Sequence, residues 1–581
     1  MLGDGDEKLL SLFDYILFAL TLLGSFLVGA YFGLSKNKPR TTEEYLIGGK
    51  SVNVLPIAIS LVASGISGNT FLAVPADIYK FGSNYVWTLL ADCIGFLATY
   101  YIFLPIYFNL QVVSIFEYLE QRFDKNVRRL TSVLNLCATL CYAPLVLYLP
   151  SLAFSQVSGI PVHAITVVTC LTCTLYTTVG GFKAVVWTDA LQFVLMVGSV
   201  IAVVGIGAHS VGGLWQALAI AVRGDRWEIF NFSFDLTSRN PLWGPMVGHI
   251  FFALSTLTMN QGAIQKYMGL KKFQDVKKCI CLHLVGHIAL KWMTVLIGNV
   301  AYAKYVECDV LQSHKIAKID QLVPYFVLDI AGSIKGLPGL FIAGMFSAAL
   351  STLSATFNAL AATIHSDLIA PFLSNDVLRR REGHILRSIV VIAGSICIIS
   401  ALFVDRLGSL MAFINGSVGV TCGLFVGLFS LGMVFPMAHS KGALWGIVSG
   451  FAVVGTITIV NQWYTLHGIT NNFAKPLSVE LCETPINITQ PSDIHQPEQP
   501  FVLFRLSFWY NSVMSALIVT LVGLCVSWCS KNDRPWVDPD LISPIFKFLL
   551  VQRDMNGNSL DMYTIASSYD TDKYHFEDSQ S

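Results

Sequence analysis

Apolar stretches long enough to cross a lipid bilayer recur along the whole of this 581-residue sequence. A membrane-spanning helix needs about 20 predominantly apolar residues, and only helices or closed barrels can satisfy the backbone inside a bilayer. Charged residues make up only 13 % of the chain, about half the fraction found in soluble proteins. The sequence therefore predicts an all-α polytopic membrane protein.

About thirteen transmembrane helices are expected. The first covers Leu10 to Leu34, and basic residues follow it closely. The loops and tail assigned to the cytoplasmic side hold 24 Lys or Arg residues and the outer segments hold 12, with Lys291 inside a span. This distribution follows the positive-inside rule and predicts an extracellular N-terminus and a cytoplasmic C-terminus. The other expected spans are 54–79, 84–110, 128–152, 160–179, 184–208, 243–267, 276–304, 337–366, 386–405, 408–434, 442–464 and 503–530.

Two expected external loops, 209–242 and 465–502, carry features typical of an extracellular surface. Each holds a glycosylation sequon, at Asn231 and at Asn487. Cys308 and Cys482 also fall in segments assigned to the outside, so a disulfide between them is possible, although the sequence alone cannot establish it. Most other cysteines lie in apolar spans. The sequence has no paired CxxC motifs, so a metal site is not expected.

The stretch from Phe341 to Ile364 is apolar enough to span a bilayer but carries several hydroxyls. With 3.6 residues per turn, one face of this helix collects small and polar side chains. Small residues and hydroxyls allow close contact between membrane helices, and the same oxygens could also bind a cation. Both interpretations stay open on this helix alone. The residues of this face are Ser347, Ala348, Ser351, Thr352, Ser354, Ala355 and Asn358.

Two spans are interrupted by glycine and polar residues at their middle, at 64–69 and at 258–262. Each interrupted span opens a set of five, 54–208 and 243–434, and an odd-numbered unit that is repeated directly has inverted topology. Interrupted helices at matching positions of two inverted halves indicate a binding site near the midplane. The alternative is that these patches only permit tight packing. The segments 1–34, 442–530 and 531–581 then form an extra first helix, two extra C-terminal helices and a cytoplasmic tail.

Several motifs resemble those of one transporter family. The sequence 176–184, YTTVGGFKA, resembles the signature of the sodium:solute symporter family, and 185–192 and 44–50 are also typical of it. The likeness covers about residues 10–530 and implies the five-plus-five inverted repeat of LeuT. The later family signature is only partly met, because Met437 stands where the family has a basic residue. Within the family, the stretches that favour the branch of monocarboxylate, multivitamin and iodide transporters are 75–82, 320–329 and 350–362.

The resemblance implies a sodium site between the first broken helix and the 337–366 helix. Its ligands would be the backbone carbonyls of Ala63, Ile66 and Ala348 and the hydroxyls of Ser351 and Thr352. The spacing of the last three residues, i, i+3 and i+4, places them on one helix face. An unwound turn at Ile66 would free carbonyl groups that a regular helix would occupy.

A second cation site or ion path is also implied, formed by Ser64, Asp189, Gln192 and Gln261. A carboxylate within a membrane span is costly and is therefore a functional candidate. Alternatively, Asp189 lies near the cytoplasmic end beside Lys183 and is simply solvated. Both interpretations stay open.

The implied substrate site is lined by Asn69, Thr70, Asn260 and Gln261. Thr70 matches the monocarboxylate carriers, but residues 65–69 differ from the pattern of the whole branch, which leaves the pocket and its cargo open. Lys291 is interpreted as snorkelling or bonding to carbonyls, in preference to pairing with an acid or meeting substrate.

The sequence as a whole predicts a sodium-coupled secondary active symporter of the plasma membrane that imports a small organic anion, with a monocarboxylate favoured. Biotin, pantothenate or iodide are alternative cargoes, and a sodium-binding channel or sensor is the rival from another class. No motif indicates an enzyme, a nucleic-acid partner or a cofactor. The expected partners are the anion, sodium ions and lipid, and the oligomeric state is open.

Overall fold

The protein is mainly helical, with loops between the helices, in the residues described by its computed structural model, which are 10–34, 41–239, 241–331, 334–404, 410–467, 469, 474–480, 482, 500–530 and 537–550. Asn487, most of the loop 465–502 and most of the tail 531–581 lie outside them. The α-helices are α1 (Leu12–Leu34), α2 (Thr42–Ile47), α3 (Val54–Gly65), α4 (Gly68–Phe81), α5 (Trp87–Ala98), α6 (Leu104–Leu110), α7 (Ile115–Arg122), α8 (Lys125–Ser158), α9 (Val162–Ser210), α10 (Leu214–Arg223), α11 (His249–Thr258), α12 (Gln261–Met268), α13 (Phe273–Lys304), α14 (Leu322–Ala331), α15 (Leu337–Thr363), α16 (Asn375–Phe403), α17 (Leu410–Val434), α18 (Ser440–Leu466) and α19 (Tyr510–Cys529).

Ten helical segments in this described part are long and apolar enough to cross a membrane, or eleven with the bent pair α3 and α4. The 49-residue α9 is interrupted at Gly181, whose φ is 59°. A straight helix of that length would measure about 73 Å, more than twice the hydrocarbon thickness. We therefore interpret α9 as two of the expected spans, while the short helices α11 and α12 together match the expected span 243–267. The total of thirteen stays a prediction.

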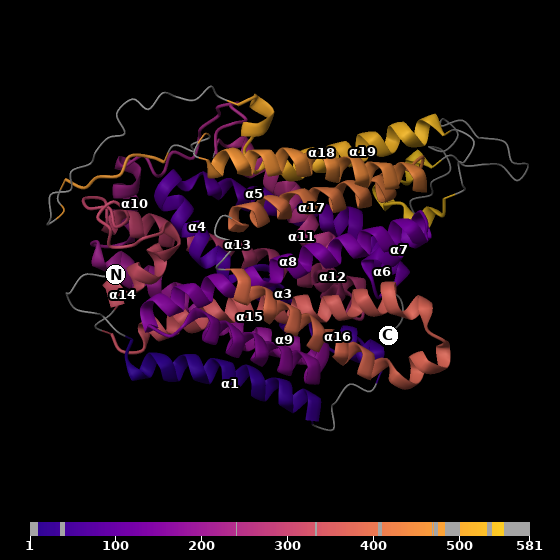
Figure 1. Cartoon of the computed structure of the whole chain (residues 1–581), viewed down its shortest axis with the longest axis horizontal. Coiled ribbons are helices and arrows are strands. Elements are labelled where there is room, and N and C mark those ends of the chain that lie inside the picture. Colours follow the sequence, from indigo (N-terminus) through magenta and orange to yellow (C-terminus); the bar gives the residue numbers. More distant parts are fainter. Residues whose placement is uncertain are drawn as a thin grey trace, which may run out of the picture.

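The long helices run side by side, with α1 at one edge of the bundle and α18 and α19 at the opposite edge (Figure 1). Glycines permit the close contacts at both edges. A Cβ at Gly29 or Gly33 of α1 would collide with α9, and one at Gly423 of α17 would collide with α19. Such contacts hold membrane helices together, because lipid provides no hydrophobic force between them.

Both predicted interruptions are present. Helices α3 and α4 meet at an angle of 53°, because Ile66 and Ser67 have extended backbone conformations between them. Helices α11 and α12 are separated by Met259 and Asn260, and the Asn260 side chain accepts a hydrogen bond from the Ala263 N–H to cap α12. Each break exposes helix ends within the bundle, where backbone groups can bind ions and polar ligands.

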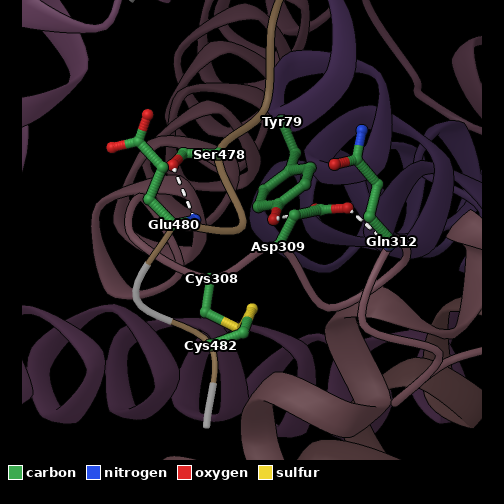
Figure 2. Close-up of a disulfide and its surroundings, with 7 residues drawn as sticks. All are labelled: Tyr79, Cys308, Asp309, Gln312, Ser478, Glu480 and Cys482. Carbon is green, nitrogen blue, oxygen red and sulfur yellow. Dashed lines mark hydrogen bonds between the residues drawn. A yellow bond between two sulfur atoms is a disulfide. The ribbon is translucent and has the colours of Figure 1, made fainter. Parts of the chain in front are cut away.

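A disulfide fastens a loop over the end of α4 (Figure 2). Cys308 and Cys482 are bonded, with 5.0 Å between their Cα atoms and 174 positions between them in the sequence. Beside the bond, the buried Tyr79 hydroxyl of α4 donates to Asp309 Oδ1 at 2.6 Å. The Asp309 N–H donates to the Ser478 carbonyl at 2.9 Å. The disulfide therefore joins two loops that are already hydrogen-bonded to each other and to the bundle.

Replacing Cys308 and Cys482 together by serine should destabilise this cap. Removing a disulfide that closes a long loop costs about 2–4 kcal/mol, so we expect a lower melting temperature in detergent, measured by tryptophan fluorescence. The matched control replaces Cys137 and Cys141, two exposed free cysteines of α8, and should melt like the unmodified chain. Equal melting temperatures for both variants would contradict a stabilising role of the disulfide.

Candidate functional site

The residues of the expected sodium site meet where α3 breaks against α15. Ala63, Ile66, Ala348 and Ser351 are fully buried. The Thr352 hydroxyl lies 3.2 Å from the Ser64 carbonyl of α3 and 3.0 Å from the Ala348 carbonyl of its own helix. One hydroxyl thus connects the two helices that the site requires.

Ser351 contributes a second oxygen at this junction. Its hydroxyl is buried and makes no hydrogen bond of ordinary distance and angle among the described residues, and it lies close to the Asp189 carboxyl of α9. An unsatisfied buried hydroxyl is costly unless something binds it. Together with the carbonyls released at the α3 break, it supplies the neutral oxygen ligands suited to an alkali cation. The residues present therefore fit a sodium ion.

Asp189 of α9 is completely buried and is paired with Lys266 of α12, a residue that the sequence analysis did not select. Lys266 Nζ lies 3.0 Å from Asp189 Oδ2, and it donates to the Ser64 hydroxyl at 2.7 Å and to the Ser60 carbonyl at 3.0 Å. The Ser60 hydroxyl also donates to Asp189, at 2.5 Å. The ammonium group of the protein itself therefore lies among oxygens from α3 and α9. The interpretation that Asp189 is simply solvated is wrong, because the carboxylate is buried and is paired with Lys266.

The expected second cation set is only partly brought together. Ser64 and Asp189 share Lys266, whereas the Gln192 amide donates to Ser25 of α1 at 3.0 Å. The side chain of Gln261 accepts from the Ile115 N–H of α7 at 2.8 Å and donates to the Val113 carbonyl. In this conformation the hydrogen bonds of the two glutamines go to Ser25 and to the start of α7, and neither side chain is bonded to Asp189.

The expected substrate residues lie at the first turns of the two half-helices that follow the breaks. Asn69 and Thr70 belong to α4, and Asn69 Oδ1 is buried without a hydrogen-bond partner among the described residues. Asn260 is exposed, although it lies within an expected span, and Gly65 is exposed as well. Both breaks therefore carry a residue on the accessible surface of the helix bundle. The Gln261 side chain is hydrogen-bonded to the backbone at the start of α7, so it is the least accessible of the four to a substrate.

A cluster of charged and titratable side chains lies beyond the α3 break. Lys291 of α13 donates to Asp92 Oδ2 of α5 at 2.6 Å, and His249 of α11 lies 3.0 Å from Asp92 Oδ1. The interpretation that Lys291 snorkels or bonds only to carbonyls is therefore wrong, because a carboxylate on another helix holds it in the interior. Two signals could have revealed the cluster. Asp92 is a carboxylate inside an expected span, and His283, His287 and Lys291 recur at four-residue spacing on one helix face.

At the end of the bundle where α7 lies, another buried acid holds the helices together. Asp367, in the π-helical turn after α15 (Ile364–Ile369), binds Arg128 of α8 at 2.5 Å. It also accepts from the hydroxyls of Ser114 and Ser132, at 2.9 and 2.7 Å. This network fastens α7 and α8 to the end of α15 and so fixes the helix that Gln261 contacts.

Comparison with known proteins decides the family. Residues 45–450 match the sequence model of the sodium:solute symporter family. The chain belongs to this family. Members of this family are sodium-coupled transporters. The chain is therefore a multi-pass membrane transporter and not an enzyme, and sodium is its coupling ion.

The curated relatives of this symporter cover almost its whole length. It is 34 % identical over 570 residues to sodium-coupled monocarboxylate transporter 1 of Xenopus laevis. The aligned region covers 95 % of this chain and 91 % of that protein. It is 33 % identical to sodium-coupled monocarboxylate transporter 2 of Mus musculus, over 92 % of this chain and 86 % of that one. The human sodium/iodide cotransporter is 34 % identical over 560 residues, which cover 93 % and 87 % of the two chains.

The fold of the symporter also matches a solved structure. A sodium-coupled sialic acid symporter in a substrate-bound, outward-open state superposes with a TM-score of 0.73 at 21 % identity. The match covers 89 % of this chain and 98 % of the other. It confirms the predicted LeuT-like fold class, to which the broken helix pairs α3–α4 and α11–α12 belong.

Proposed function

We propose that this symporter imports a small monocarboxylate by alternating access, driven by sodium bound between Ala63, Ile66, Ala348, Ser351 and Thr352. The observation that carries the proposal is the junction of the α3 break with α15. There the buried Ser351 hydroxyl and the Thr352 hydroxyl lie beside carbonyls released from helical bonding. The relatives named as monocarboxylate transporters support the choice of cargo.

Sodium at this junction would link the two sets of five spans, 54–208 and 243–434, because α3 belongs to the first and α15 to the second. An ion held by both helices favours the conformations in which they are close together. Its release separates the two ligand groups and allows the halves to rock to the other side. Each net positive charge carried inward gains about 2.3 kcal/mol per 100 mV of membrane potential.

A carboxylate fits the helix ends beside this sodium site. Helices α4 and α12 begin at the two breaks, and the first N–H groups of a helix favour an anion. Asn69 and Thr70 at the start of α4 and Asn260 before α12 would supply polar contacts, while Gln261 would contribute after leaving α7. Residues 65–69 depart from the branch pattern, so biotin, pantothenate and iodide remain in the cargo panel.

Two-electrode recording in oocytes tests the function. The cells are perfused with lactate, nicotinate, biotin, pantothenate or iodide, with and without sodium. A sodium-dependent inward current with lactate or nicotinate is expected if more than one sodium ion accompanies each anion. Electroneutral transport produces no current and is detected instead by the uptake of labelled cargo. Uptake that does not need sodium would contradict symport, and sodium current without any cargo accumulation would favour a channel or sensor.

The proposed orientation places the chain in the plasma membrane with an extracellular N-terminus and both sequons outside. Asn231 lies in the loop after α10 and has an accessible side chain, and Asn487 is the second acceptor. We expect deglycosylation to shift the protein on a gel, and Asn231→Gln and Asn487→Gln each to remove one step of that shift. Deglycosylation without any shift would remove this support for the orientation.

A further inference from the structure

Three helices from both sets of spans bring Asp92, His249 and Lys291 into mutual contact within the bundle. All three are at least nine-tenths buried, with exposed fractions of 2, 5 and 5 %. Lys291 Nζ lies 2.6 Å from Asp92 Oδ2 and 3.0 Å from His249 Nε2, and His249 Nε2 lies 3.0 Å from Asp92 Oδ1. The three polar atoms of this triangle come from α13, α11 and α5.

One nitrogen of this triangle cannot satisfy both of its neighbours. A lysine ammonium only donates hydrogen bonds and an ionised carboxylate only accepts them. If His249 Nε2 carries a hydrogen, it can donate to Asp92 but opposes the Lys291 ammonium. If it carries none, it accepts from Lys291 but opposes the Asp92 carboxylate. Each protonation state therefore leaves one short contact unfavourable, so small structural changes can move a proton onto or off the cluster.

His287 lies between the triangle and the exposed residue Gly65 at the α3 break. Its Nε2 lies 3.7 Å from Asp92 Oδ2, a gap that a small ring movement closes. Its Nδ1 is buried without a hydrogen-bond partner among the described residues. That atom lies 3.5 Å from the position of a Cβ on Gly65. Gly65 is exposed at the α3 break, so the two nitrogens of one imidazole face the solvent-accessible break and the buried carboxylate.

The remaining titratable groups around this path come from several elements. His283 of α13 has its Nε2 near Gly65 and its Nδ1 bonded to the Tyr267 hydroxyl of α12 at 2.9 Å. Tyr85, in the turn before α5, lies under Lys291, whose Nζ is 5.9 Å from its ring centroid. Cys93 is next to Asp92 in sequence. More distant charges are Lys266, paired with Asp189, and Asp77, paired with Arg239.

We propose that Asp92, His249, His287 and Lys291 form a proton-binding site that couples proton movement to transport. A proton from solvent at Gly65 is taken up by His287 Nδ1, and His287 Nε2 passes its proton to the Asp92–His249 pair. The cluster gains one proton and one positive charge, and it releases the proton to the opposite side after the halves rock. Histidine is suited to this transfer because one nitrogen can accept a proton while the other donates one.

The link to transport comes from the position of the cluster. Asp92 lies on α5 of the first set of spans, whereas His249, His287 and Lys291 lie on α11 and α13 of the second. A change of charge here alters the attraction between the two sets, beside the break at which sodium and substrate are expected. The inference rests on the proposed symport and adds a proton to it as a further coupling ion.

Reconstituted vesicles separate this inference from the symport itself. The purified chain is placed in liposomes that contain a pH-sensitive dye, with valinomycin and equal potassium to hold the membrane potential at zero. An inward sodium gradient drives uptake of labelled lactate, and protein-free liposomes give the background from lactate diffusion. The expected result is proton movement above this background, with initial uptake rates that vary about tenfold between about pH 5 and about pH 8.

His287→Gln should retain sodium-driven uptake but lose proton movement, and its rates should vary less than about twofold over the same pH range. His209→Gln is the matched control, since His209 is an exposed histidine at the end of α9. Sodium-driven lactate uptake without proton movement in the unmodified chain overturns the proton site and leaves the symport intact. Absence of sodium-driven lactate uptake counts instead against the proposed function.

A measurement that needs no cargo is the infrared difference spectrum of the purified chain in nanodiscs between about pH 5 and about pH 8. Exposed histidines and carboxylates give pH-dependent bands in every variant, so the spectrum of each variant is compared with that of the unmodified chain. Asp92→Asn and His287→Gln should each lose the carboxyl or imidazole bands of the cluster, whereas His209→Gln should lose only the band of its own exposed imidazole and keep those of the cluster. Spectra in which neither Asp92→Asn nor His287→Gln loses a band that His209→Gln retains overturn the assignment.

Discussion

Replacing Ser351 and Thr352 together by alanine is expected to abolish sodium-driven uptake while the protein still reaches the cell surface. The Ser351 hydroxyl is buried and makes no hydrogen bond of ordinary distance and angle among the described residues, and the Thr352 hydroxyl lies between carbonyls of α3 and α15. A hydrogen bond or ligand contact to a charged group contributes about 1.5–3 kcal/mol. Loss of two such contacts should lower the apparent sodium affinity about 100-fold or more.

Labelled uptake as a function of sodium concentration measures this effect, with surface biotinylation as the measure of delivery. The matched control is Thr356→Ala, one turn further along α15, where the hydroxyl donates to the Thr352 carbonyl at 2.8 Å and stays within its own helix. Its sodium dependence should change less than about twofold, because the hydrogen bond that it loses is local to α15 and the Thr352 contact with α3 is unchanged. Normal uptake by the double variant at limiting sodium would contradict the assignment of the site.

Single substitutions distinguish the two roles of Thr352, as a sodium ligand and as a contact between α15 and α3. Thr352→Ser keeps the hydroxyl and should keep sodium-driven uptake, whereas Thr352→Ala also removes the contact with the Ser64 carbonyl. Ser351→Ala removes a ligand and leaves the Thr352 contact with α3 in place. If only Thr352→Ala lowered uptake, the hydroxyl face of α15 would act in helix packing, which is the alternative that the sequence left open.

The sequence predicts the helical elements well because each of them depends on local pattern. Apolar length marks the spans, and glycine with polar residues marks the breaks at Ile66 and Asn260, where no tertiary information is needed. The contact between α3 and the Ser351–Thr352 face of α15 follows from the family resemblance and the i, i+3, i+4 spacing. The expected spans 160–179 and 184–208 divide next to Gly181, where α9 is interrupted, and the expected span 243–267 covers the short pair α11–α12.

The partners of buried charges could not be predicted in the same way. Lys266 lies one residue before the end of the expected span 243–267, so its charge suggests a solvated interface. Only tertiary packing places it on Asp189, 77 positions away. The same holds for Lys291, whose acid partner is 199 positions away on α5. Amide side chains such as Gln192 and Gln261 have several partners within reach, and only the packed structure decides among them.

Neutralising either member of the Asp189–Lys266 pair should damage the protein more than neutralising both. Lys266→Met leaves a buried carboxylate, and Asp189→Asn leaves a buried ammonium. Removing one partner of a buried ion pair costs about 3–5 kcal/mol, whereas replacing both by uncharged groups is often neutral. We therefore expect each single variant to reach the surface poorly and to melt earlier in detergent. The double variant Asp189→Asn with Lys266→Met should recover most of both properties.

Uptake by this double variant decides between a role of Asp189 in the ion path and a purely structural role. If the carboxylate forms part of the ion path, the double variant folds but imports less than about a tenth of the normal amount. This is the result that we expect, because Ser64 is bonded to Lys266 and its carbonyl contacts Thr352 of the sodium site. The control is Lys183→Met, a partly exposed lysine near the interruption of α9, which removes a positive charge without stranding a buried acid. Full uptake by the double variant would show that the pair serves only to hold α9 and α12 against α3.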